Sequence, residues 1–139
     1  MREILFKAKR IDNGEWIIGS LIQTPYLGSI RSWISSEQED KARLREISSN
    51  QAVFRAFEVR TDTICQYTGL TDKKGKKIWE NDVVYMRCNG LSGYGKVIYE
   101  NGCFWIDDNK RGRKYPFSNH DVKYRVDGNI FDNPELLSE

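Results

Sequence analysis

The stretch that decides the fold covers residues 63–84 and reads TICQYTGLTDKKGKKIWENDVV. It contains a turn-forming Thr68-Gly69, and the charged loop at 72–77 carries a glycine suited to the tip of a hairpin. Residues 80–84 then begin a strand, because two consecutive valines favour extended backbone. The stretch predicts a compact β unit with a basic turn, and it contains no catalytic constellation.

Length and composition predict a soluble globular protein. A chain of 139 residues suits one domain or two very small ones and can bury a core. Charged residues make up 30%, apolar residues 39%, and mean hydropathy is −0.65, which is typical of a folded protein with a polar surface. The net charge of +2 is too small to indicate nucleic-acid binding by itself.

The cysteines and the histidine do not form a metal-binding pattern. Cys65, Cys88 and Cys103 are widely spaced, and His120 is the only histidine. A structural zinc site needs four ligands, usually in two close pairs, so we expect neither metal nor cofactor. No apolar run approaches the ~20 residues of a membrane helix, so neither a signal peptide nor a membrane span is expected.

Two Asn-Gly dipeptides predict β-hairpins. Asn13-Gly14 lies between the β-rich runs 4–11 and 16–22, and Asn101-Gly102 lies between the runs 95–100 and 103–106. A type I′ turn needs positive φ at both central residues, which asparagine and glycine tolerate. We therefore expect a type I′ turn at both places.

Residues 24–51 have a different character. Pro25, Gly28 and several serines predict that strand structure stops there. Ser36 and Glu39 then form a capping box, so residues 36–47 predict a helix supported by (i, i+4) charge pairs. Its apolar stripe is thin, which indicates a short helix on the surface.

The remaining pattern predicts a mainly β (α+β) fold. Further strands are expected at 53–60, 83–88 and 122–126, with loops at 89–93 and 107–114. We expect residues 1–62 to form an N-terminal hairpin with a helical excursion. Residues 63–139 should form a rolled, closed sheet that resembles an SH3-like barrel, packed with the first part as one compact unit.

Four blocks of the sequence resemble the YopX family of phage and prophage proteins. They are residues 2–6 with 16–19, residues 66–78, residues 80–84 and residues 128–137. The resemblance covers most of the chain except 24–51. The sequence departs from the family pattern at three positions: Lys9 replaces the usual tryptophan, and Cys65 and Asn81 each replace a usual glycine. Asparagine tolerates positive φ, so Asn81 can hold the same turn as glycine.

The family resemblance implies an architecture and a setting but no chemistry. The family has no assigned activity, cofactor or catalytic residue. The resemblance implies a phage-encoded, largely β protein of the host cytoplasm that self-associates.

Two basic clusters are candidate nucleic-acid-binding sites. The first lies between Trp105 and Tyr115, and cations beside aromatic rings suit single-stranded nucleic acid. The second lies in the loop at 72–77, which otherwise reads as a solvated hairpin tip. Asp107 and Asp108 at the root of the first cluster would partly cancel its field. The candidate residues are Lys76, Lys77, Lys110, Arg111, Arg113 and Lys114.

The other polar residues favour structural roles. The 66–69 block could be a binding surface in which Tyr67 stacks on a ligand. We favour a structural role, in which Gly69 takes positive φ in a turn and the Tyr67 ring fills the core. His120 has no nucleophile that the sequence places nearby, and Glu80 and Asp82 alternate at the start of a strand. We therefore expect no enzyme.

These observations lead to two functional hypotheses. The first is a non-enzymatic phage accessory protein that acts through protein binding and self-assembly, as a homo-oligomer or with a host or phage protein. The alternative is a nucleic-acid-binding accessory protein that uses the basic loop from Lys110 to Lys114. No membrane partner is expected.

Overall fold

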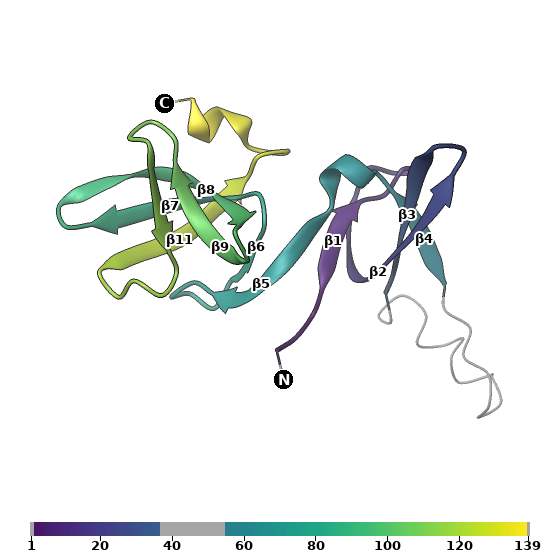
Figure 1. The fold of residues 1–139 in the computed structure, drawn as a ribbon, viewed down its shortest axis with the longest axis horizontal. Coiled ribbons are helices and arrows are strands. Elements are labelled where there is room, and N and C mark those ends of the chain that lie inside the picture. The colour runs from purple at the N-terminus through teal and green to yellow at the C-terminus, as the bar shows by residue number, and fades with distance from the viewer. Residues whose placement is uncertain (1, 37–54, 139) are drawn as a thin grey trace. The chain divides into compact units, whose positions relative to one another are not determined.

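The computed structural model describes residues 2–36 and 55–138 (Figure 1). Backbone contacts divide the chain into two units, Met1–Gln66 and Tyr67–Glu139. The described residues form antiparallel strands and two short 3-10 turns, η1 (Thr61–Thr63) and η2 (Pro134–Leu137), so the mainly β prediction is confirmed. All of the predicted helix except Ser36 lies outside the described residues. The first two residues of the strand expected at 53–60 also lie outside them.

The first unit is an antiparallel sheet that encloses a small core. Its strands are β1 (Phe6–Lys9), β2 (Trp16–Tyr26), β3 (Ser29–Ser35), β4 (Ala56–Val59) and the start of β5 (Cys65–Thr71). They lie in the order β4-β3-β2-β1-β5, and an isolated bridge from Arg10 to Val59 also joins the ends of β1 and β4. The core side chains are Ala8, Ile17, Ile34 and Val59.

The turn between β1 and β2 is not the predicted type I′ turn. Pairing stops at Lys9 and Trp16, and in the loop only Gly14 has positive φ, at +72°. The Asn13 side chain instead accepts a hydrogen bond from the Glu15 N–H at 2.9 Å. This local Asx turn holds Asn13 out of the left-handed region, so the prediction was wrong here.

The chain also remains in strand conformation where a break was predicted. β2 continues through Pro25 to Tyr26 and pairs with β3. A two-residue turn joins them, with φ of +45° at Leu27 and +82° at Gly28, as a type I′ turn requires. Proline is tolerated because, in the described part of the chain, β1 pairs with β2 only as far as Gly19 and leaves an edge beyond it.

The second unit contains a five-stranded sheet in the order β10-β9-β8-β7-β11. The strands are β7 (Asp82–Cys88), β8 (Leu91–Glu100), β9 (Cys103–Asp108), β10 (Arg113–Pro116) and β11 (Val122–Asn129). The short strand β6 (Lys77–Trp79) pairs with β5 instead. Its core side chains are Ile78, Val84, Met86, Val97, Ile106 and Val122. The sheet is not closed, contrary to the prediction, because β10 and β11 are its two edges and no pairing among the described residues joins them.

The hairpins of this sheet follow the Asn-Gly rule. Asn101 and Gly102 have φ of +52° and +79°, which confirms the predicted type I′ turn between β8 and β9. Asn89 and Gly90 form a second such turn, with φ of +49° and +81°. β8 therefore begins at Leu91, inside the segment that was predicted as a loop.

A buried carboxylate organises the turn between β5 and β6. Asp72 is only 5% exposed. Its Oδ1 accepts hydrogen bonds from the backbone N–H groups of Lys74 and Lys76, both at 2.9 Å. Its Oδ2 accepts one from the Val126 N–H at 3.0 Å, next to the irregularity in β11 between Val126 and Gly128. Asp72 thus shapes its own turn and fastens that turn to β11.

The neighbouring 66–69 block has the structural role that the sequence favours. Tyr67 is buried and its ring lies 5.4 Å from that of Trp79. The Thr68 hydroxyl donates to the Ile78 carbonyl at 2.8 Å, and Gly69 takes a φ of +85° where the register of β5 and β6 shifts. These contacts hold β5 and β6 together around the core.

The Asp72 clamp predicts a pH-dependent stability. Burial acts to raise the pKa of Asp72, but the three backbone N–H donors outweigh it and lower the pKa below its ordinary value. The charged form therefore stabilises the fold above the unfolded-state pKa, and this contribution is lost as pH falls through the lower folded-state pKa. We expect Asp72→Asn to lose about 2–4 kcal/mol of unfolding free energy at neutral pH.

Urea unfolding of both proteins across the acid range measures this effect. The difference between wild type and Asp72→Asn should shrink as the wild-type carboxylate becomes protonated. Asp121→Asn, at an exposed position, is the matched control and should be neutral. If the variant had lost the same unfolding free energy at every pH, the role of the Asp72 charge would be contradicted.

Candidate functional site

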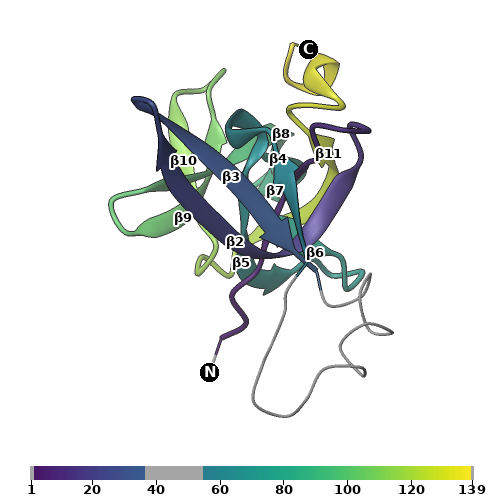
Figure 2. The ribbon, with the colours of Figure 1, turned by 90° about the vertical axis from the view of Figure 1, so that its right-hand side faces the viewer.

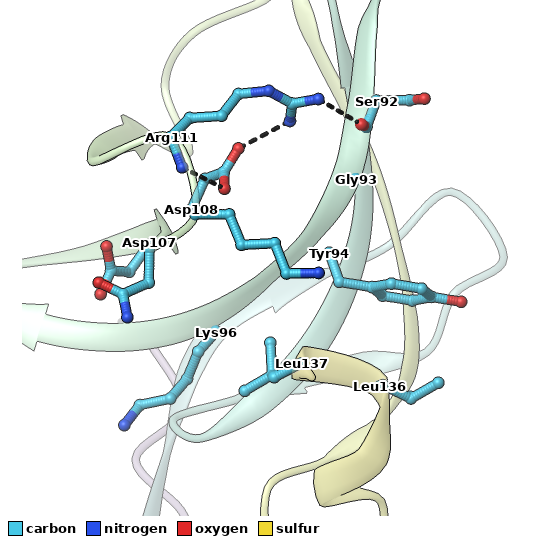
Figure 3. Close-up of a pocket in the computed structure, with 11 residues that line it drawn as sticks. Ser92, Gly93, Tyr94, Lys96, Asp107, Asp108, Arg111, Leu136 and Leu137 are labelled. Atoms are coloured by element: carbon cyan, nitrogen blue, oxygen red, sulfur yellow. Dashed lines mark hydrogen bonds and ion pairs between the residues drawn. The ribbon is translucent and has the colours of Figure 1, made fainter. Parts of the chain in front are cut away.

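The described part of the second unit contains a cavity of about 610 Å³ beside the β9–β10 turn (Figure 3). It arises because β9 pairs with β8 only from Lys96 onward, so residues 91–95 of β8 have β7 on one side and no strand of the described chain on the other. The turn at 109–112 and η2 border this opening. The cavity is lined by Ser92, Gly93, Tyr94, Lys96, Asp107, Asp108, Asn109, Lys110, Arg111, Leu136 and Leu137.

Arg111 bridges the turn and the open edge of β8 (Figure 3). Its Nη1 lies 2.9 Å from Oδ2 of Asp108, and its Nη2 donates to the Ser92 carbonyl at 2.9 Å. Asp108 is only 2% exposed and also accepts the Arg111 backbone N–H at 3.2 Å. Because a buried carboxylate needs such compensation, the guanidinium is committed to a structural contact.

Lys114 is also engaged by a carboxylate. Its Nζ lies 2.8 Å from Oε2 of Glu100, and this hydrogen bond is the main reason that the pKa of Lys114 is raised. Both side chains are partly exposed, so the pair contributes little to stability but lowers the net charge of the loop. Glu100 lies 14 residues before Lys114, and only the pairing of β8, β9 and β10 brings them together.

The predicted nucleic-acid-binding residues occupy three separate places. Lys110 and Arg111 share the cavity, whereas Arg113 and Lys114 lie on β10. Lys76 lies in the β5–β6 turn. Lys77 begins β6, where its Nζ lies 4.8 Å from the centre of the Tyr67 ring. Within the part of the chain that the structure describes, Lys110 and Arg113 have no carboxylate partner.

The other titratable residues do not converge on this cavity. His120 is exposed in the turn before β11 and is not among the described residues that line the cavity. Cys65 is buried, Cys88 half-buried and Cys103 exposed. Across residues 2–36 and 55–138, no three side chains of the types His, Cys, Asp or Glu gather as metal ligands would. No described helix is long and apolar enough to cross a membrane.

A second candidate surface is the β2–β3 hairpin of the first unit (Figure 2). Large apolar side chains are exposed along it, and Leu27 at its tip is 90% exposed. Arg31 is the one charged residue between Ser20 and Ser35. It lies over the rings of Tyr26 and Trp33 and forms a two-point pair with Glu58 at 2.8 Å. The exposed apolar residues of the hairpin are Ile18, Ile22, Tyr26, Leu27 and Ile30.

The sequence did not reveal this surface because a break was predicted at Pro25 and Gly28. Ile18, Ile22 and Tyr26 recur at every fourth residue of β2 and so lie on one face of the strand, and this spacing is the signal that would have found the surface.

Comparisons with known proteins identify the family. The family model of the YopX protein matches residues 5–138, so the chain belongs to the YopX family, as the sequence blocks predicted. The crystal structure of protein EF1440 from Enterococcus faecalis is 21% identical, with a TM-score of 0.52 over 99% of each chain. Protein yopX from Bacillus subtilis is 14% identical, with a TM-score of 0.55 over 99% of each chain. These identities show a shared fold alone, and no functionally curated protein matches the chain.

The contact between Arg111 and Asp108 predicts different effects of two neighbouring arginines. Arg111→Gln removes the charged partner of a buried carboxylate, so we expect a loss of about 1–3 kcal/mol of unfolding free energy. Arg113→Gln, on exposed β10, should change it by less than about 0.5 kcal/mol. Chemical denaturation of the two variants makes the comparison, and equal losses would show that Arg111 is not a structural bridge.

Proposed function

We propose that this YopX-family protein is a non-enzymatic binding protein that self-associates through the β2–β3 hairpin. The observation that supports this most strongly is the isolation of the outer half of the hairpin. β1 pairs with β2 only up to Gly19, and β4 pairs with β3 only from Ser32 onward. In the described chain, residues 24–26 and 29–31 therefore pair only with each other, and residues 20–23 have a strand on one side only.

A two-stranded ribbon of this kind is marginally stable alone in water. This one nevertheless exposes Tyr26, Leu27 and Ile30, and Ile22 is exposed at its base. Completely burying one such side chain contributes about 1.5–3 kcal/mol. A partner that covers the ribbon would gain this free energy and would also order the strands.

A second copy of the same chain is the partner that fits the charge pattern. The ribbon carries only Arg31, and that charge is already paired with Glu58. Two such surfaces can therefore meet without like-charge repulsion, as a symmetric dimer interface requires. Pro25 lacks a backbone donor and hinders extension of the sheet along this edge, so we infer that faces pack rather than edges.

The non-enzymatic part of the proposal rests on the cavity of the second unit. Its buried carboxylate, Asp108, is occupied by Arg111. The described residues that line it include neither histidine nor cysteine. The accessory role in a phage or prophage, the cytoplasmic location and the likeness of the second sheet to an SH3-like barrel rest on the sequence resemblance and belong to the proposal.

The alternative function, nucleic-acid binding by the loop from Lys110 to Lys114, has weaker support. Arg111 and Lys114 are each engaged by a carboxylate, so two of the four cations offer little charge to a phosphate.

Sedimentation velocity tests the proposed self-association. Wild type should sediment as a dimer or larger assembly at micromolar concentration. Ile22→Lys with Ile30→Lys places charge on both faces of the hairpin. We expect the dissociation constant of the assembly to rise at least tenfold, which is a loss of about 1.4 kcal/mol of association free energy. Leu91→Lys, at an exposed leucine in the second unit, is the control and should sediment like wild type.

Two results would contradict the proposal. One is a strictly monomeric wild type at micromolar concentration. The other is an equal loss of association in the Leu91→Lys control, because the effect would then be unrelated to the ribbon.

A further inference from the structure

The outer face of β7 and β11 carries a basic groove that the linear sequence does not show. It is shallow, with a volume of about 110 Å³. Four cations and two tyrosines line it: Lys73, Tyr85, Arg87, Lys123, Tyr124 and Arg125. They come from the β5–β6 turn, β7 and β11, which are separated by up to about 50 residues of sequence.

The register of the two strands places like charges directly opposite each other. Lys123 pairs with Arg87, and Arg125 pairs with Tyr85. Two cations that face each other across a strand pair destabilise the sheet. In the described chain neither Lys123 nor Arg87 has a carboxylate partner to relieve this repulsion. A bound anion would relieve it.

The Asp72 clamp adds a third uncompensated cation to this face. Asp72 is bonded to the Val126 N–H, so the next residue, Lys73, is held against β11 and lines the groove. The following residue, Lys74, donates its backbone N–H to Asp72 at 2.9 Å, so the same clamp also holds its backbone. A buried carboxylate therefore fixes the backbone that carries these surface lysines.

Among the described contacts, only one of the four lining cations is neutralised. Arg125 lies 2.8 Å from Asp127, whose other oxygen accepts the Tyr94 hydroxyl at 3.1 Å. The Arg125 guanidinium also lies over the Tyr85 ring at 4.8 Å, which restricts its orientation. Lys73, Arg87 and Lys123 remain available, whereas two of the four cations between Lys110 and Lys114 are engaged by carboxylates.

From this arrangement we propose that the face formed by Lys73, Arg87, Lys123 and Arg125 binds the phosphate backbone of a nucleic-acid strand, without reading its base sequence. Residues two apart on one strand are separated by about 6.8 Å, and adjacent strands lie about 4.8 Å apart. The cations are therefore spread over a surface that contacts several phosphates in a row rather than one. Contacts to phosphates position a strand but do not discriminate bases.

Fluorescence anisotropy of a labelled oligothymidylate with the full chain tests this site. Wild type should bind, with an affinity that falls as salt increases. Arg87→Glu with Lys123→Glu should weaken binding at least tenfold. It should also make the plot of log affinity against log salt shallower by about 0.7 for each phosphate that the protein no longer neutralises. This variant replaces one like-charge pair by another, so its thermal stability should stay close to that of wild type.

The matched control is Lys110→Glu with Arg113→Glu, which changes the net charge by the same amount in the β9–β10 turn and at the start of β10. Its affinity should stay within twofold of wild type. The proposal is overturned if both double variants weaken binding equally, because only net charge would then act. It is also overturned if wild type does not bind at low salt.

Two further measurements distinguish a strand-binding face from a site for single anions and from a purely structural role of Lys123. Inorganic phosphate should displace the oligonucleotide no better than chloride at equal ionic strength, and full displacement would show a site for isolated phosphate groups instead. Lys123→Glu alone places opposite charges across the strands, so it should raise the midpoint of thermal unfolding while it weakens binding. A lower midpoint would show that Lys123 has a structural role and would overturn the inference.

Discussion

The architecture of the second unit depends on buried carboxylates that accept backbone N–H groups. Moving a carboxylate into the interior costs several kcal/mol unless hydrogen bonds replace the lost water. Asp72 meets this requirement with three amide donors, Asp82 accepts the Trp79 N–H at 2.8 Å, and Asp108 is compensated by Arg111. Each lies at or beside a turn. In a unit without α-helices among its described residues, these carboxylates fix the turns that position the strands.

The same carboxylates determine which surface charges are free. Asp108 attracts the arginine of the turn that follows it, so the most conspicuous basic run in the sequence is partly neutralised. Asp72 is satisfied by backbone amides and has no ion pair among the described contacts, so the lysines of its turn keep their charges facing outward. A buried aspartate therefore removes a cation from one loop and presents cations in another.

Local chemistry predicted both hairpins, but it predicted the turn type only where the asparagine side chain had no competing partner. Asn101-Gly102 forms the expected turn, but Asn13 bonds to the Glu15 N–H and leaves the left-handed region. Leu27 adopts positive φ although this costs a leucine about 1–2 kcal/mol, because strand pairing on both sides imposes it. The family blocks and the strand-rich pattern predicted the β architecture, whereas the pairing of edges, which decides whether a sheet closes, depends on contacts distant in the sequence.

The candidate surfaces were hidden for a related physical reason. A basic run that is contiguous in sequence is easy to see, but nearby or cross-strand acids neutralise half of it, whereas Arg87 and Lys123 meet only through strand register. The two surfaces we propose also differ in the force that drives binding. Burial of the apolar β2–β3 ribbon strengthens with excluded salts such as sulfate, whereas phosphate contacts on the β7–β11 face weaken as counterions accumulate. Salt therefore acts in opposite directions on the two surfaces. Self-association can be measured at high sulfate concentration, where phosphate contacts are weak, and nucleic-acid binding can be measured at low salt.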